Sequence, residues 1–332
     1  MNIPMLLLPS RRAALRRIAV TGAALSHCLQ AAAQGLSARP YRIVVGSPSG
    51  SLGDVLSRLM AQKLNETTGQ PALVDNRPGA ALAIAADLVA KSPGDGHTLL
   101  LAPDAAMVVN PFVYPKLPYD PAKDFRSVAL LGKASLVLIA SPKLNVKTFA
   151  EFVQRAQGKP KALNFGSGGA GHPTHIVMEL LANRVGMQLT HVAYKGTSPA
   201  LQGMLAGDVD AMISGVVEAM PFIKAGTAIP LAASGPEARD IFPTLPQFND
   251  FHPDLDVSVW FAMFAPASTP REVVTLLNAE INKALSQPDV LRRLGEFGLK
   301  PMPGPTTDLD QLIQQDLARF GPLVKSLGIL SN

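Results

Sequence analysis

The sequence predicts an α/β protein in which short buried strands alternate with amphipathic helices and the sheets are mostly parallel. The apolar run Tyr41–Gly46 reads as the first strand, and Ser51–Asp54 has the pattern of a capping box that opens the following helix. Ser135–Ala140 is a continuous apolar run, which is typical of a strand buried on both faces. The chain has 332 residues, enough for two domains that each bury a core.

The same alternation continues along the chain. Further strands are expected at Leu73–Asn76, Thr98–Ala102, Ala162–Phe165, Thr190–Tyr194, Asp210–Ser214, Ile229–Ala233 and Ser258–Ala265. The part from Pro270 to about Leu327 has helical spacing of its apolar residues. Two proline-rich irregular stretches, Val109–Pro121 and Asp240–Asp256, each precede an expected crossing between domains. We therefore expect residues 34–138 plus 261–332 to form domain 1 and residues 139–260 to form domain 2, with a ligand cleft between them.

Residues 1–33 have the pattern of a signal peptide. Four arginines between Arg11 and Arg17 precede the uncharged run Ile18–Ala33, which ends in three alanines. Ser10–Arg16 also resembles a twin-arginine export signal, whereas Leu25–Cys28 is a poor lipoprotein box because His27 precedes the cysteine. The prediction is a periplasmic protein without a lipid anchor.

Charge and cysteine content exclude several classes of protein. The net charge is +5, and the leader arginines supply four of these charges, so the remainder is near +1. A nucleic-acid partner is therefore not expected. Cys28 is the only cysteine and lies in the leader, so a disulfide, a catalytic thiolate or a cysteine-bound metal is not expected in the mature chain.

Three loops share one design: each joins the end of a strand to the start of a helix. They are Gly46–Ser51, Gly166–His172 and Lys195–Ser198. The ends of strands in open α/β sheets converge on a ligand crevice, and helix N-termini favour anions there. Gly166–Gly171 matches G-x-G-x-x-G, but Tyr194-Lys195 stands where a dinucleotide site needs an acid. The loops thus predict an anion site that is not a nucleotide site.

Two other kinds of site have sequence features in this region. His172, His175 and Glu179 resemble a metal face, but the spacing lacks a zincin arrangement, and inward packing of His175 is the better interpretation. No G-x-S-x-G elbow is present. An exported hydrolase or isomerase that uses His172 and Asp104 remains the alternative from another class.

Several ordered segments resemble the solute-binding proteins of tripartite tricarboxylate transporters, the TctC or Bug family. These segments are Asp75–Ala80, Lys91–Leu101, Asn110-Pro111, Leu117–Pro121, Lys123–Phe125, His191–Leu201, Gly207–Asp210, Trp260-Phe261, Ala265-Pro266 and Leu277–Asn282. The resemblance implies the type II periplasmic binding protein fold, in which two α/β domains with hinge crossings close over a ligand. It also implies capture of a small organic carboxylate through main-chain groups and hydroxyls, with no enzymatic activity and no cofactor.

The resemblance further implies the site residues. The ligand-binding set carried over is Ser47, Gly50, Ser51, Asp104, Ala105, Ser167, Gly169, His172, Thr197, Ser198 and Ser214. Several residues depart from those common in the family, so the ligand need not be a simple dicarboxylate. They are Gly46, Ser47, Ser49, Ser51, Asp104, His172 and Ser214. The expected partners are a small carboxylate and the membrane subunits of a transporter; a signalling sensor is the alternative partner. The protein is expected to be a monomer that binds no nucleic acid.

Overall fold

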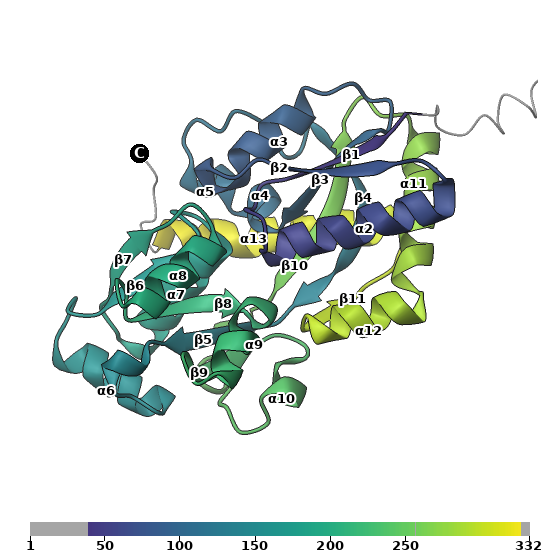
Figure 1. Ribbon diagram of the computed structural model, residues 1–332. Coiled ribbons are helices and arrows are strands. Elements are labelled where there is room, and N and C mark those ends of the chain that lie inside the picture. The colour runs from purple at the N-terminus through teal and green to yellow at the C-terminus, as the bar shows by residue number, and fades with distance from the viewer. Residues whose placement is uncertain (1–38, 256, 327–332) are drawn as a thin grey trace, which may run out of the picture. The chain divides into compact units, whose positions relative to one another are not determined.

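The computed structural model describes residues 39–255 and 257–326, and the chain from Pro40 onward forms one compact unit built on two β-sheets (Figure 1). The predicted leader, including Cys28, lies outside the described residues. Within the described part, no helix combines the length and the apolar character needed to cross a bilayer.

The first sheet has the strand order β11-β4-β10-β3-β1-β2. Its strands are β1 (Tyr41–Val45), β2 (Ala72–Asn76), β3 (Thr98–Pro103), β4 (Phe125–Ala134), β10 (Val259–Pro266) and β11 (Leu299–Pro301). β1 pairs in parallel with β2 and β3, whereas β10 runs antiparallel to β3 and β4, and β11 antiparallel to β4.

The second sheet has the order β7-β6-β8-β5-β9. Its strands are β5 (Leu136–Ala140), β6 (Asn164–Ser167), β7 (Thr190–Ala193), β8 (Ala211–Gly215) and β9 (Ile229–Ser234). β6 is parallel to β7 and β8, but β5 is antiparallel to β8 and β9. The prediction of mostly parallel sheets is therefore wrong. β5 and β10 are the strands that directly follow the crossings. The chain enters each of them from the other sheet and not through a covering helix, so each pairs antiparallel with its neighbours.

Helices cover both faces of the first sheet. They are α2 (Leu52–Thr68), α3 (Ala83–Ala90), α4 (Ala105–Val108), α5 (Asn110–Val113), α11 (Arg271–Leu285), α12 (Pro288–Glu296) and α13 (Thr306–Ser326), with a short 3₁₀ turn η1 at Ala80–Leu82. α2 and α11 pack side by side on one face. On the other face, α3, α4 and α13 share one core with the strands, in which Leu100 and Phe264 meet Ala106 and Leu309.

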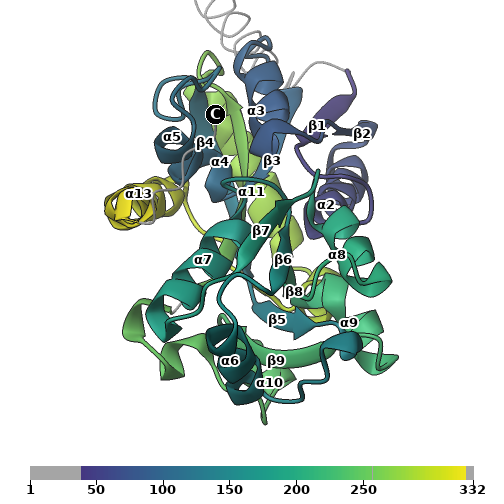
Figure 2. The ribbon, with the colours of Figure 1, turned by 90° about the vertical axis from the view of Figure 1, so that its left-hand side faces the viewer.

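The second sheet is also covered on both faces (Figure 2). Its helices are α6 (Phe149–Gly158), α7 (Pro173–Val185), α8 (Thr197–Ala206), α9 (Val216–Lys224) and α10 (Ala238–Ile241), with 3₁₀ turns η2 (Pro142–Leu144), η3 (Phe248–Asp250) and η4 (Pro253–Leu255). α8 and α9 pack on one face around Val137, Ile139 and Met212, and α6 and α7 lie on the other. The α/β class predicted from the sequence is confirmed.

The chain passes between the sheets twice. β4 of the first sheet and β5 of the second are separated by Ser135 alone, and the chain returns through residues 235–258 between β9 and β10. We call the elements of the first sheet the first half and those of the second sheet the second half. The exact domain boundaries stay a prediction, because the chain from Pro40 onward forms one compact unit.

Three strand assignments differ from the sequence prediction. Phe125–Ala134 is a ten-residue strand that the sequence analysis did not identify, because Arg126 and Lys133 interrupt its apolar pattern. β6 begins at Asn164, two residues later than expected. The strand Leu299–Pro301 interrupts the C-terminal region, which was expected to be helical throughout.

Candidate functional site

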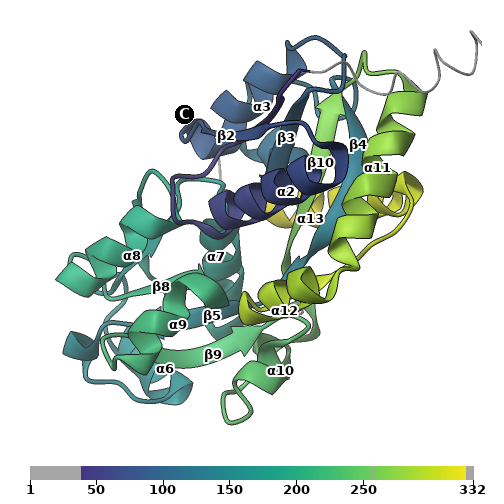
Figure 3. The same ribbon diagram turned by 45° about the vertical axis from the view of Figure 1, so that its right-hand side comes forward.

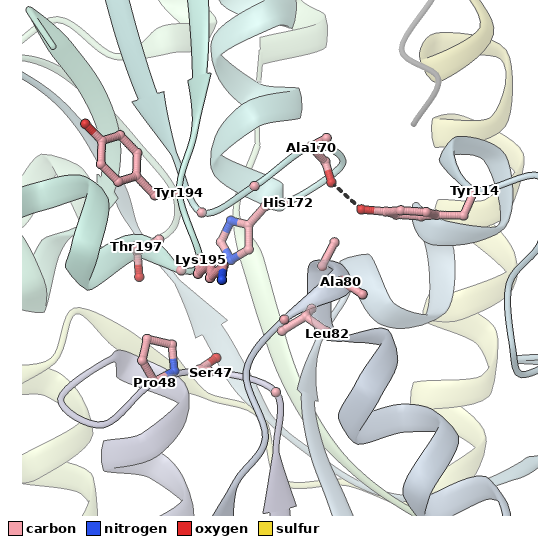
Figure 4. A pocket seen from close by; sticks show the side chains of 16 residues that line it. Ser47, Pro48, Ala80, Leu82, Tyr114, Ala170, His172, Tyr194, Lys195 and Thr197 are labelled. Atoms are coloured by element: carbon pink, nitrogen blue, oxygen red, sulfur yellow. Dashed lines mark hydrogen bonds between the residues drawn. The ribbon is translucent and has the colours of Figure 1, made fainter. Parts of the chain in front are cut away.

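Two cavities lie between the halves. The outer cavity measures about 170 Å³, and loops from both halves form its wall (Figure 4). It is lined by Gly46–Pro48, Gly79–Leu82, Tyr114, Gly168–Ala170, His172 and Tyr194–Thr197. The inner cavity measures about 50 Å³ and lies against the crossing strands. It is lined by Ser47, Ser51–Gly53, Pro103, Ala134, Leu136, His172–Thr174, Thr197, Gly215, Glu218, Val259 and Phe261.

The start of α2 forms part of the inner wall. Ser51 is the N-cap, and its Oγ accepts a hydrogen bond from the Asp54 N–H at 3.3 Å. Asp54 Oδ2 accepts from the Gly50 N–H at 3.0 Å, one residue before the position that a regular capping box uses. Asn76 donates to both the Asp54 carboxylate and the Ser47 carbonyl, each at 3.0 Å. These bonds fix the loop that follows β1.

His172 caps α7, and Pro173 occupies the first position of the helix. The Thr174 N–H donates to His172 Nδ1 at 3.3 Å, so the proton of the neutral ring lies on Nε2. Burial, and then the charge of His175, lower the pKa of His172 from 6.5 to about 4. Near neutral pH this ring is therefore an uncharged hydrogen-bond donor at the edge of both cavities.

The N-terminus of α8 lies at the outer cavity without a side-chain cap. Its N-cap is Gly196, at φ +117°, so the N–H groups of the first turn have neither an intrahelical nor a side-chain cap partner. A Cβ on Gly196 would lie 2.7 Å from the ring of Pro48, so glycine permits the close approach of the loop from the first half. Lys195 lines the same cavity and adds a positive charge beside this helix end.

Direct contacts join the halves on both sides of the cavities. The Tyr114 hydroxyl donates to the Ala170 carbonyl at 2.7 Å (Figure 4). The N-terminal end of α2 points towards the second half (Figure 3), and the Leu52 N–H donates to Glu218 Oε1 at 3.0 Å. A Cβ on Gly171 would lie 2.8 Å from Val113, which marks a third close approach. The structure is thus that of a closed cleft.

Residues 56–329 match the model of the tripartite tricarboxylate transporter family receptor. The chain belongs to this family. Its fold and its relatives are those of solute-binding proteins and not of enzymes, which confirms the resemblance and the expectation that the chain is not an enzyme.

Relatives of the receptor match over almost their full length. A UPF0065 protein from the tcbD–tcbE intergenic region of Pseudomonas sp. strain P51 is 36% identical over 89% of this chain and 88% of its own. The structure of Rhodopseudomonas palustris Rpa4515 with adipate superposes with a TM-score of 0.84 at 32% identity, covering 88% of this chain and 98% of that one. MatC from R. palustris with bound malate gives a TM-score of 0.80 at 32% identity, covering 86% and 99%.

Five of the predicted site residues line the cavities. Ser47, His172 and Thr197 line both, Gly169 lines the outer cavity, and Ser51 lines the inner one. Thr197 Oγ1 donates to Glu218 Oε1 at 3.0 Å. These five come from all three loops that the sequence analysis identified.

Three predicted serines lie behind the cavity walls. The Ser167 Oγ accepts from the Gly169 N–H at 3.1 Å and lies 2.6 Å from His191 Nε2, so it supports the glycine loop. The Ser214 Oγ lies 3.2 Å from the Gly215 carbonyl and 3.5 Å from Glu218 Oε2. The Ser198 Oγ is buried and has no hydrogen-bond partner among the described residues.

Gly50, Asp104 and Ala105 line neither cavity. Gly50 is exposed, and its N–H is bonded to Asp54. Asp104 is buried as the N-cap of α4, where its Oδ1 accepts from the Ala105 N–H at 2.8 Å. Burial, and then repulsion from Asp316, raise the pKa of Asp104 well above its usual range. The structure therefore places Asp104 in a structural position.

Sequence reasoning missed four parts of the site. Lys195 and Tyr114 were not selected, and Ala80–Leu82 follow the turn at Pro78-Gly79, which was the one signal for that loop. Glu218 reads in the sequence as an ordinary acid in the first turn of a helix. Burial raises the pKa of Glu218, and hydrogen bonds from Leu52, Thr197 and Ser214 counteract this in part.

The alternative chemistries find little support. Within residues 39–255 and 257–326, no three histidine, cysteine or acidic side chains are grouped to hold a metal. His175 instead packs in the interior, with its ring 3.8 Å from that of His191 and stacked on Phe165. Of the pair considered for hydrolysis or isomerisation, His172 lines both of these cavities and Asp104 lines neither.

Proposed function

We propose that this receptor captures a small organic carboxylate in the cleft between its halves and is held closed by the ligand. The observation that carries this proposal is the outer cavity, in which the uncapped N-terminus of α8, the Nε2–H of His172 and the Lys195 ammonium lie together. Donors and positive charge from these elements suit a carboxylate group.

The energetics are sufficient without an arginine clamp. A hydrogen bond to a charged group contributes about 1.5–3 kcal/mol, and a helix dipole adds about 0.3–1 kcal/mol. Three or four such contacts approach the roughly 8 kcal/mol that a micromolar dissociation constant requires. The adipate and malate bound to two structural relatives support a carboxylate as the class of ligand.

Closure would couple capture to delivery. The single-residue crossing at Ser135 and the return segment 235–258 are the places where the halves can rotate against one another. A ligand that touches both halves favours the closed state. We propose that the exported receptor, directed out of the cytoplasm by its leader, presents the closed form to the membrane subunits of a tripartite transporter.

Titration calorimetry with the full receptor tests this function. We expect saturable one-site binding of a small organic carboxylate, with adipate, malate and monocarboxylates of similar length as the compounds titrated. Lys195→Met should weaken binding about three- to thirtyfold, because a charge-assisted contact is lost whose strength is reduced by the solvent exposure of Lys195. Lys283→Met, which removes an exposed lysine on α11, is the matched control. Equal affinity of both variants would contradict the outer cavity as the carboxylate site.

A further inference from the structure

Glu218 places a carboxylate of the chain itself inside the cleft. It lies in the first turn of α9, lines the inner cavity and reaches the opposite half. Its Oε1 accepts from the Leu52 N–H and from Thr197 Oγ1, both at 3.0 Å. Leu52 is the first residue of the 17-residue helix α2, and without Glu218 its N–H group would be free to bind an anion at this helix end. The anion position at this helix end is therefore already occupied.

The second oxygen of Glu218 is poorly satisfied. Its one hydrogen-bond contact among the described residues is Ser214 Oγ at 3.5 Å, and that hydroxyl lies closer to the Gly215 carbonyl, at 3.2 Å. Glu218 is half-buried, and a carboxylate oxygen that is partly shielded from water favours a further donor, because burial without one is costly. The surrounding wall is largely apolar, with Leu52, Leu136 and Phe261 beside it.

The groups that act on Glu218 are all neutral donors, namely Leu52, Thr197 and Ser214. A second ligand carboxylate at this end would face a like charge. Among the described residues no cation is hydrogen-bonded to Glu218, so such a juxtaposition is strongly unfavourable. A hydroxyl or an ammonium group there would supply the donor that Oε2 lacks. Glu218 would therefore reject a ligand whose far end is a carboxylate and accept one whose far end is a hydroxyl or an ammonium, and the two effects together give specificity.

We propose that Glu218 determines the specificity of the receptor: it selects monocarboxylates whose far end carries a hydrogen-bond donor, a hydroxyl or an ammonium, and rejects dicarboxylates. This assignment rests on the proposed function, since the ligand's own carboxylate is taken to bind in the outer cavity. On this assignment the receptor would reject adipate, the ligand with which the relative Rpa4515 was solved.

Calorimetry with ligands matched in length tests the assignment. One series is hexanoate, 6-hydroxyhexanoate, 6-aminohexanoate and adipate; the other is butyrate, 4-hydroxybutyrate, 4-aminobutyrate and succinate. In at least one series the full receptor should bind the hydroxy or amino acid at least tenfold more tightly than the dicarboxylate. The stronger of these two binders identifies the donor as hydroxyl or ammonium.

Glu218→Gln is the decisive variant, because the amide oxygen still accepts from Leu52 and Thr197 while the charge is lost. It should tighten dicarboxylate binding at least tenfold and weaken amino acid binding, whereas Glu272→Gln on the exposed start of α11 should change neither. A merely structural role would weaken all ligands together. Dicarboxylates that bind the unchanged receptor as tightly as their matched partners would overturn the role of Glu218 alone. A failure of every carboxylate to bind would overturn the proposed function and this assignment with it.

Discussion

The histidines of the second half show how single side chains hold the glycine loop in place. His191 Nε2 lies 2.6 Å from the Ser167 Oγ, which accepts the Gly169 N–H. The Gly171 N–H donates to His175 Nδ1 at 3.1 Å, and the rings of His175 and His191 stack. The direction of the first bond depends on the tautomer of His191, and in the second bond Nδ1 of His175 is the acceptor. The loop that lines the outer cavity therefore rests on these two imidazoles.

This arrangement predicts a pH dependence of stability. Burial, then the charge of His175, lower the pKa of His191 from 6.5 to about 4, and His172 is lowered to about 4 as well. Between about pH 4 and pH 6.5 the unfolded chain binds more protons than the folded one. The unfolding free energy therefore has its maximum value above about pH 6.5 and falls as the pH drops towards 4. Denaturant titrations followed by the fluorescence of Trp260, the one tryptophan, measure this fall.

His191→Gln keeps a side chain able to bond Ser167 but removes the titration. The fall between pH 6.5 and 4 should then be smaller than in the unchanged receptor, with the remainder due to His172. A variant that loses as much stability as the unchanged receptor over this range would contradict the role of His191.

At the scale of elements, the loop after β2 holds an unusual backbone. Ala80, Ala81 and Leu82 have φ values of +45°, +44° and +79°, and for residues with a Cβ this region costs about 1–2 kcal/mol each. The buried Asn110 offsets part of this cost, because its Nδ2 donates to the Ala81 carbonyl at 2.8 Å and to the Tyr119 hydroxyl at 3.1 Å. The loop that lines the outer cavity is thus held in a strained form by the start of α5.

Asn110→Ala should therefore affect binding as well as folding. Loss of the buried bonds should lower the unfolding free energy by about 1–3 kcal/mol, and release of the strained loop should weaken carboxylate binding several-fold. Tyr119→Phe is the control: it removes the hydroxyl that donates to the Ala106 carbonyl at 2.6 Å, but it keeps the bond from Asn110 to Ala81. Chemical denaturation and calorimetry separate the two effects. If Tyr119→Phe weakened binding as much as Asn110→Ala, the loop would not be the cause.

The elements also show how far the sequence could lead. β1, β5 and the helix starts at Ser51 and His172 were predictable, because apolar runs and capping residues act locally. Five of the predicted site residues line the cavities for the same reason: they lie in loops that end strands. β4 was missed, and Asp104 was carried over as a ligand-binding residue although it is the buried N-cap of α4, because both outcomes depend on neighbours distant in sequence. Glu218 and Ala80–Leu82 could be identified as site residues only from the contacts of the folded chain. No local sequence pattern predicts that an acid will reach across a cleft.

At the scale of the whole molecule, two chain crossings and a few direct contacts connect the two halves. The chain crosses twice near one end of the cleft, and the contacts Tyr114 to Ala170 and Leu52 to Glu218 close it elsewhere. One net hydrogen bond contributes about 0.5–1.5 kcal/mol, which changes a closed-to-open ratio about two- to tenfold. Contacts of this size hold the halves together without preventing the cleft from opening.

Tyr114→Phe should shift this balance, because it deletes the hydroxyl that reaches Ala170 while the ring remains. We expect the ligand-free receptor to expand in small-angle X-ray scattering and its affinity for a carboxylate to fall about two- to tenfold, since the bound state loses the same bond. Tyr194→Phe is the matched control. Tyr194 also lines the outer cavity, but its hydroxyl lies against Gly203 of α8 within the second half, so its loss should leave the scattering profile unchanged.

Saturating ligand should return the Tyr114→Phe receptor to the dimensions of the unchanged protein, because closure then rests on the ligand. If the variant stayed expanded with ligand bound, this prediction would be wrong. Tyr114 would then be required for the closed geometry itself, and not only for the balance between the open and closed forms.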